Sequence, residues 1–201
     1  MNTTLLIATG NPHKVEAIRR ILDNTDFELV DLSEFPDLEE PEENGATFLE
    51  NAFIKSRYYS KATGLPALAD DSGLEVDALE KRPGIHSSRF AGTETPHSEK
   101  MAKILELLDG VTGADRSGRF MCVAAATFPD GREFFAEGSM EGLIADKPSG
   151  SEGFGYDPIV YLPELGKTVA EIAAEEKDRL SHRGKAFRGL ISQLLNSAQS
   201  Q

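Results

Sequence analysis

The sequence has a single cysteine and lacks any apolar stretch long enough to cross a membrane. One cysteine cannot form a disulfide within the chain, which suits the reducing cytoplasm. Cys122 lies in the apolar run 120–124, so we expect a buried free thiol. Neither the ~20 apolar residues of a membrane span nor a basic amino-terminal segment followed by an apolar core is present. We therefore expect a cytoplasmic protein with no membrane partner.

The chain also has fewer basic than acidic residues. The chain has 21 Lys and Arg against 34 Asp and Glu, a formal net charge of −13. This balance argues against a nucleic-acid polymer or an anionic membrane as the main partner. It leaves room for a single nucleotide, which needs only a local cationic pocket or a metal ion. At 201 residues, without repeats or a low-complexity linker, we expect one domain spanning residues 1–201.

Two adjacent aspartates, Asp70 and Asp71, end the apolar run 65–69 and are followed by Ser72 and a glycine. Ligands of α/β proteins collect at the carboxyl ends of strands, so an acidic strand end is a candidate site. Neighbouring carboxylates repel unless a proton or cation relieves them, and Mg²⁺ prefers carboxylate oxygens. The alternative is a polar turn, because Asp, Ser and Gly are ordinary turn residues. A separate strand is expected over 74–79, where apolar residues alternate.

A strand-to-helix turn is predicted near the amino terminus. The buried strand 5–8 leads into Asn11, a good N-cap, and Pro12, which suits the first helical position. Free backbone N–H groups and the helix dipole at such a turn favour an anion, and Lys14 adds a positive charge. The pattern of a Walker loop is absent. The alternative is an ordinary connection with a solvated lysine.

A second helix is predicted from the capping box that Thr47 and Glu50 form, running to about Lys61 and ending at Gly64. Asn51 and Lys55 are four residues apart and therefore share a face. Lys55 either lies along the core with its ammonium in water or reaches a phosphate. The preceding acidic loop, 36–45, reads as solvated surface, although Glu43 could turn inward to a metal.

The glycine-rich stretch 149–158 surrounds one aromatic ring, Phe154, with residues that let a ligand approach the backbone closely. An exposed ring beside the carboxylate of Asp157 suits a stacked base whose edge is hydrogen-bonded. The alternative is a tight connection with Phe154 in the core.

The last predicted helix begins after Ser181, which places His182 and Arg183 in its first turn. Cations there oppose the helix dipole, so they indicate a ligand, and Lys177 lies close enough in sequence to join them. Further strands are expected over 29–32, 119–128, 133–136 and 159–162. A further helix should start at Thr95–Pro96 and stop at Gly110.

Taken together and in order, six motifs resemble those of the inosine triphosphate pyrophosphatase family. They are Thr9–Lys14, Thr47–Lys55, Ala69–Asp77, Pro83–Arg89, Gly153–Pro158 and Ser181–Gly184. Each motif alone is weak, but six in the family's order cover nearly the whole chain. The departures are His13 where glycine is frequent, His86 where an aromatic is common, and Glu152 where a small residue is frequent.

The resemblance implies an α/β fold, elongated and two-lobed around a long central mixed sheet, with a nucleotide cleft between the lobes. It also implies a homodimer that uses Mg²⁺ to hydrolyse inosine, deoxyinosine or xanthosine triphosphate to the monophosphate and pyrophosphate. This activity removes non-standard purine nucleotides from the cellular pool.

The resemblance also implies residue roles. Asp71 is the catalytic carboxylate and a metal ligand, with Asp70 and Glu43 as its acidic companions. The substrate-binding residues are Thr9, Gly10, Asn11, Pro12, His13, Lys14, Lys55 and Ser72 toward the phosphates and sugar, and Phe154, Gly155, Tyr156, Asp157, Lys177, His182 and Arg183 toward the base.

Two other functions fit the same residues. A Mg²⁺-dependent phosphatase with Asp70 or Asp71 as nucleophile would release orthophosphate through an acyl-phosphate. A nucleotide sensor would bind the triphosphate without turnover. The identity of the product separates all three.

Overall fold

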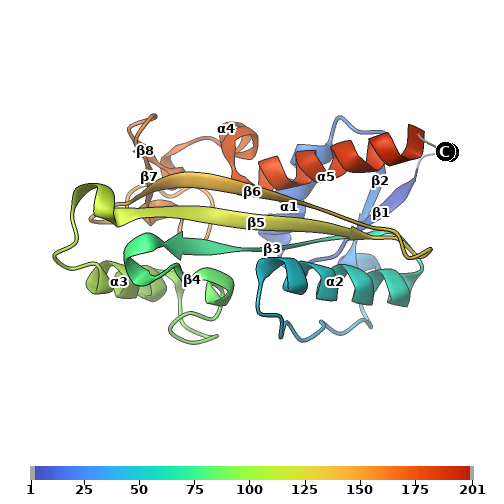
Figure 1. Ribbon diagram of the computed structural model, residues 1–201, viewed down its shortest axis with the longest axis horizontal. Helices are drawn as coiled ribbons and strands as arrows, with labels where there is room; N and C mark the ends of the chain where they lie inside the picture. Colours follow the sequence, from blue (N-terminus) through green and yellow to red (C-terminus); the bar gives the residue numbers. More distant parts are fainter. Residues whose placement is uncertain (1–2, 200–201) are drawn as a thin grey trace. The chain divides into compact units, whose positions relative to one another are not determined.

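The computed structural model describes residues 3–199 as an α/β protein built on a mixed sheet of eight strands. The hydrogen-bonded order is β2-β1-β3-β5-β6-β7-β8, and β4 pairs separately with β3. The strands are β1 (Thr4–Ile7), β2 (Glu28–Asp31), β3 (Ala67–Val76), β4 (Arg82–Pro83), β5 (Ser117–Thr127), β6 (Glu133–Ile144), β7 (Val160–Leu162) and β8 (Lys167–Thr168) (Figure 1). The α/β class with a mixed sheet is as predicted.

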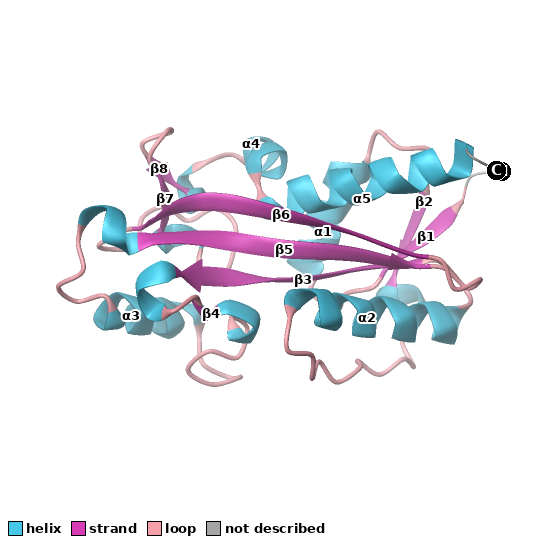
Figure 2. Cartoon of the chain, in the orientation of Figure 1, coloured by secondary structure: helices cyan, strands magenta, loops and turns pink. Residues whose placement is uncertain are grey.

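Strand direction divides the sheet into parallel and antiparallel parts. β1 pairs in parallel with β2, matching Leu6 to Val30, and with β3, matching Leu6 to Ala67. Antiparallel pairing joins β3 to β4, β6 to β7 and β7 to β8. Figure 2 distinguishes these strands from the helices, which are α1 (Pro12–Leu22), α2 (Phe48–Thr63), α3 (His97–Leu107), α4 (Ala174–Leu180) and α5 (His182–Gln199).

The chain divides into two compact units. Unit 1 takes the residues up to 71, then 122–138 and those from 182 onward, and unit 2 takes 72–121 and 139–181. The strands β3, β5 and β6 each contribute residues to both units. Within the described residues, no helix is long and apolar enough to span a bilayer.

Unit 1 is a three-layer arrangement with helices on both faces of its strands. One core packs Ile18 of α1 and Phe187 of α5 against Leu5 and Leu68. The other packs Tyr59 of α2 against Leu6 and neighbouring small residues of β1 and β3. In Figure 1, α2 and α5 accordingly lie on opposite sides of the strands of this unit. Side chains that alternate along β3 therefore face different helices.

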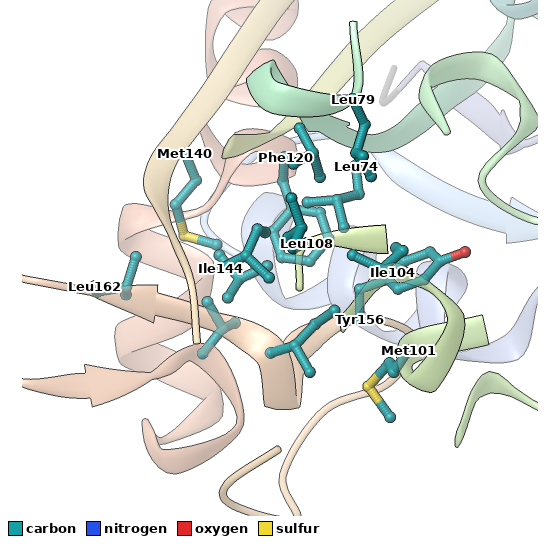
Figure 3. Packing of buried hydrophobic residues seen from close by; sticks show 14 of the residues in the cluster. Leu74, Leu79, Met101, Ile104, Leu108, Phe120, Met140, Ile144, Tyr156 and Leu162 are labelled. Carbon is teal, nitrogen blue, oxygen red and sulfur yellow. The ribbon is translucent and has the colours of Figure 1, made fainter. Parts of the chain in front are cut away.

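Unit 2 has its own core, shown in Figure 3. Leu74 and Val76 of β3, Ile104 of α3 and Ile144 of β6 are each almost inaccessible to solvent. Tyr156 belongs to this cluster, and its hydroxyl donates a hydrogen bond of 2.8 Å to the carbonyl oxygen of Ser87. The aromatic body is thereby buried while its polar end is satisfied.

Several local predictions are confirmed. Asn11 caps α1 with Pro12 as its first residue, and Gly64, at φ 72°, ends α2 in the left-handed conformation that suits glycine. Cys122 is a buried free thiol. Burial raises the pKa of that thiol well above its usual value, so it stays protonated.

Two predictions of strand length are wrong. β3 does not end at Asp70 and resume at Leu74, because it runs unbroken from Ala67 to Val76. Its pairing with β1 stops at Leu68, so the aspartates follow the parallel part of the sheet although the strand itself continues. β6 extends to Ile144 instead of ending near Ala136, because its later residues pair with β7.

Candidate active site

Asp70 and Asp71 occupy consecutive positions in the middle of β3 and so project to opposite faces of the sheet. Asp70 lies on the side of α1 and α5, where it contacts Lys14 and Arg183. Asp71 lies on the side of α2, where it contacts Asn51 and Lys55. Both carboxylates are buried, Asp70 completely and Asp71 to 7% exposure. Each aspartate thus has its own cation, and the mutual repulsion expected of neighbouring carboxylates is relieved separately on each face.

Asp70 is the centre of a buried ionic cluster in unit 1. Its Oδ2 lies 3.0 Å from the ammonium of Lys14 and 3.3 Å from Nη2 of Arg183, and the thiol of Cys122 donates to it at 3.8 Å. Burial acts to raise the pKa of Asp70, but Lys14, Arg183 and Lys55 outweigh it and hold that pKa well below its usual value. Asp70 is therefore ionised. Among the described residues its Oδ1 has no hydrogen-bond partner.

Asp71 is held by two residues of α2 that lie one helical turn apart. Nδ2 of Asn51 donates to its Oδ2 at 3.1 Å, and Nζ of Lys55 lies 3.6 Å from its Oδ1. The same ammonium donates to Glu43 at 3.0 Å, so two carboxylates converge on one lysine. Burial raises the pKa of Asp71 in spite of Lys55 and Lys14 nearby. A carboxylate of raised pKa is a better proton acceptor once ionised.

Lys55 is buried, which alone would lower its pKa. The charges of Asp71, Asp70 and Glu43 outweigh that burial and raise it, so the ammonium stays charged. Of the two alternatives for Lys55, a solvated end along the core does not describe this structure, because Nζ is directed at carboxylates.

The turn 9–14 differs from its prediction in one respect. The backbone N–H groups of His13 and Lys14 are not free, because Oδ1 of Asn11 accepts both, at 3.0 and 3.3 Å. This is the ordinary behaviour of an N-cap carboxamide. Thr9 also accepts the N–H of Asn11, at 3.3 Å. The positive character of the turn therefore rests on the ammonium of Lys14 and the helix dipole.

The start of α5, which belongs to unit 1, is buried. His182 and Arg183 are 5% and 4% exposed. Gly138 of β6 packs against this helix start so closely that an added Cβ would lie 2.2 Å from the carbonyl oxygen of His182. A cation in the first turn of a helix is unfavourable because of the helix dipole. Here the carboxylate of Asp70 balances the charge of Arg183, so the protein itself explains why a cation stands at this position.

In unit 2, the loop around Phe154 brings three predicted residues together. The carboxylate of Asp157 accepts the N–H of Phe154 at 2.7 Å and forms an ion pair with Lys177 of α4. Nζ of Lys177 lies 5.0 Å from the centroid of the Phe154 ring. The Phe154 side chain is partly exposed, so it is not tucked into the core as the alternative required. Gly155 and Tyr156 continue this loop, whereas Ser72 lies on β3 next to Asp71.

The carboxylates of this site suit a hard divalent cation only if the substrate and water supply the remaining ligands. Within residues 3–199, no group of three or more His, Cys, Asp or Glu side chains gathers closely enough to hold a metal alone. Glu43 and Asp71 nevertheless converge on one cation, the Lys55 ammonium. Mg²⁺ is commonly held by one or two carboxylates together with substrate phosphates and water, and these two carboxylates suit that mode. Asp70 faces away from them.

Sequence reasoning missed the direct role of Asn51. It is 1% exposed, accepts the N–H of Gly45 at 2.8 Å and donates to Asp71, and so ties the end of the acidic loop to that carboxylate. The signal was available, because Asn51 precedes Lys55 by four residues on the face already singled out. The involvement of Cys122 with Asp70 had no signal in the sequence beyond its apolar surroundings.

Comparisons with known proteins agree with the motifs. The profile of the Ham1 family matches residues 5–193. A dITP/XTP pyrophosphatase of Thermus thermophilus is 50% identical over 187 residues, covering 93% of this chain and 89% of that protein. A dITP/XTP pyrophosphatase of Nitratidesulfovibrio vulgaris is 46% identical and covers 94% of each chain.

Solved structures show the same fold. A HAM1 protein from Coxiella burnetii superposes with a TM-score of 0.88 at 40% identity, covering 96% of this chain and 99% of the other. A nucleoside-triphosphatase / dITP/XTP pyrophosphatase from Mycobacterium abscessus superposes with a TM-score of 0.76 at 41% identity, with the same coverage. The resemblance found from the six motifs is confirmed.

Proposed function

The chain belongs to the Ham1 family, and we propose that it hydrolyses non-standard purine nucleoside triphosphates to the monophosphate and pyrophosphate. The substrates are inosine, deoxyinosine and xanthosine triphosphate, in keeping with the names of relatives at 44–50% identity. The observation that carries the proposal is the cluster of Asp71, Asn51, Lys55 and Glu43 in a chain of this family.

Asp71 takes the catalytic role in this proposal. Its raised pKa makes it a proton acceptor, and Asn51 and Lys55 hold its two oxygens in a fixed orientation. Asp71 orients an attacking water and accepts its proton. Asp70 is suited to a different task, because two cations hold its Oδ2 and lower its pKa. A role for Asp70 in positioning Lys14 and Arg183 follows from those contacts.

The phosphates are assigned to cations of unit 1. A triphosphate carries about four negative charges, which one lysine cannot balance. Lys14, near the start of α1, and Lys55 of α2 supply two, and the remaining residues proposed for phosphate and sugar are Thr9, Gly10, Asn11, Pro12, His13 and Ser72.

Mg²⁺ is the proposed cofactor, held by Asp71 and Glu43. Asp70, which the sequence also suggested as a ligand, faces the other side of β3 and pairs with Lys14 and Arg183, so it is not included in this set. When bound, the ion supplies charge stabilisation for the pyrophosphate leaving group. Lys55 already joins the two carboxylates, so its ammonium holds them close to one another. A chelator should therefore abolish turnover while the fold persists.

Base recognition is assigned to donors and an aromatic ring. A 6-oxo purine offers an acceptor to Lys177 and Arg183, whereas a 6-amino base would meet them donor to donor. Leaving such a group unpaired costs about 1–3 kcal/mol. Phe154 provides a stacking surface for the base. The other residues proposed for the base are Gly155, Tyr156, Asp157 and His182.

The proposal also includes a cytoplasmic location and a homodimer, both expected from the sequence and its family resemblance. The lone buried cysteine is compatible with a reducing compartment. Light scattering on the purified protein tests the dimer directly, because the monomer mass is 21.9 kDa.

One assay tests the central proposal. Inosine triphosphate is incubated with the protein and Mg²⁺, and pyrophosphate is resolved from orthophosphate. Pyrophosphate in equal amount to the monophosphate is expected. Orthophosphate as the first product would favour the phosphatase with an aspartate nucleophile, and binding without either product would favour a sensor.

A further inference from the structure

The side chain of Glu40, in the acidic loop 36–45, lies against the turn to which phosphate binding is assigned. A Cβ added to Gly10 would lie 2.2 Å from Oε1 of Glu40 and 3.4 Å from its Cδ. Apart from the chain neighbours of Gly10, no other described residue has an atom within 4 Å of that position. The carboxylate oxygen therefore fills the space over the Gly10 Cα in which a side chain would begin.

The loop is attached to unit 1 on both sides of Glu40. Before it, Leu38 packs against the core that contains Tyr59 of α2, and after it Glu43 accepts a hydrogen bond from Lys55 at 3.0 Å. The Glu40 side chain itself is exposed, and within residues 3–199 its carboxylate takes part in no hydrogen bond or ion pair. The attachments keep the carboxylate near the turn, while no polar partner fixes it over Gly10.

A phosphate that approached Gly10 would meet this carboxylate. Glycine permits a close approach to the backbone because it has no side chain, but here an oxygen of Glu40 fills the space that the missing side chain leaves. Phosphate and carboxylate oxygens are both negatively charged and cannot share it. Repulsion between two exposed unit charges a few ångströms apart changes an equilibrium constant by about threefold to tenfold.

We propose that Glu40 is an electrostatic gate at the phosphate turn. Its carboxylate competes with phosphate for the space over Gly10, so it swings away when a triphosphate binds, and it weakens the binding of both the triphosphate and the pyrophosphate product. The inference rests on the proposed function, because it takes the turn 9–14 as a phosphate site. It deepens that function by naming a residue that limits the affinity of the site for anions.

Glu40→Gln tests the gate, because it removes the charge and keeps the size of the side chain. In calorimetric titrations with inorganic pyrophosphate and Mg²⁺, we expect the variant to bind about threefold to tenfold more tightly than the parent. The KM for inosine triphosphate should fall by a similar factor. The difference should shrink when sodium chloride is raised from about 0.05 M to about 0.5 M, because salt screens exposed charges.

Glu39→Gln is the matched control, because it removes the same charge from the neighbouring exposed residue. It should bind pyrophosphate as the parent does. An equal gain in both variants would assign the effect to net charge and would overturn the gate. Parental affinity in Glu40→Gln overturns it as well, and weaker binding would mean that Glu40 helps to hold the anion, which is the opposite role. Urea unfolding of the two variants should match the parent, since both side chains are exposed.

The failure of this inference is distinguishable from failure of the proposed function. A parent protein that neither binds pyrophosphate nor releases it from inosine triphosphate overturns both. A parent protein that releases it, alongside a folded Glu40→Gln variant with parental affinity for pyrophosphate, overturns only the role of Glu40.

Discussion

The ammonium of Lys14 lies 3.0 Å from Oδ2 of Asp70, and that carboxylate has no exposure to solvent. Lys14 comes from the first turn of α1 and Asp70 from the middle of β3. The lysine proposed to bind phosphate is therefore also the partner of a buried charge. A substitution at Lys14 should affect stability as well as binding.

Lys14→Ala tests this double role. We expect a higher KM for inosine triphosphate, because a phosphate ligand is lost, and a free energy of unfolding lower by about 3 kcal/mol, because removing one partner strands a buried carboxylate. Arg183 remains beside Asp70 and keeps the loss near the lower end for buried pairs. Urea unfolding and steady-state kinetics measure the two effects.

The control is the double variant Lys14→Ala with Asp70→Asn. A neutral carboxamide no longer needs the ammonium, so stability should largely return while the KM stays high. Full stability in Lys14→Ala alone would show that the ion pair contributes little, and tighter triphosphate binding would remove Lys14 from the phosphate site.

Asp71→Asn should lower kcat by roughly 10²–10⁴, the usual contribution of a positioned acid–base group. The variant should fold, because Asn keeps the shape and can still accept from Asn51. Pyrophosphate release and circular dichroism check both parts. Near-parental turnover in a folded Asp71→Asn protein would refute the catalytic assignment.

Arg183→Lys should lower the preference for inosine over adenosine triphosphate. Lysine retains a positive charge for Asp70, so the buried cluster survives, but it loses the planar fork of donors. The measurement is the ratio of kcat/KM for the two substrates, with unfolding curves as a check on the fold. If the ratio does not move, Arg183 serves the cluster around Asp70 and takes no part in reading the base.

Asp31 gives a prediction for the pH dependence of stability. A hydrogen bond from Ser33 and the guanidinium of Arg19, at 2.6 Å, lower the pKa of Asp31 to about 2. Because this pKa is lower in the folded than in the unfolded state, its stabilisation is present above pH ~4 and is lost as the pH falls toward about 2. Asp31→Asn should be less stable than the parent at pH 6, and the gap should close near pH 2. Urea unfolding across this range measures it; a gap of constant size would contradict the assignment.

Local signals in the sequence were enough to place the elements that carry the site. The cap at Asn11, the capping residue Thr47 and the left-handed Gly64 act within a few residues of the chain, so their effects can be read from neighbours. The full lengths of β3 and β6 depend on strands distant in the sequence. β3 pairs with β4 and β6 pairs with β7 near their ends, and no local pattern in the sequence predicts these pairings.

The sequence could predict which residues lie near one another but not how they pair. The motifs singled out Lys14, Lys55, Asp70 and Asp71, and the structure places all four in unit 1, in contact through ion pairs. Their pairing was not predictable, because it depends on which helix covers which face of β3. The expectation of free N–H groups at the start of α1 was incorrect, since a good cap uses the very groups that an anion would need.

Because side chains alternate along β3, the number of residues before an aspartate decides which face of the sheet it points to. Gain or loss of one residue between the pairing with β1 and Asp70 would turn every later side chain of the strand to the other face. Asp71 would then face Lys14, and Asp70 would face Lys55. An even change would preserve the faces and an odd change would exchange them. The number of residues between Leu68 and Asp71 can therefore change only by an even number if Asp71 is to stay on the face of α2, whichever residues occupy those positions.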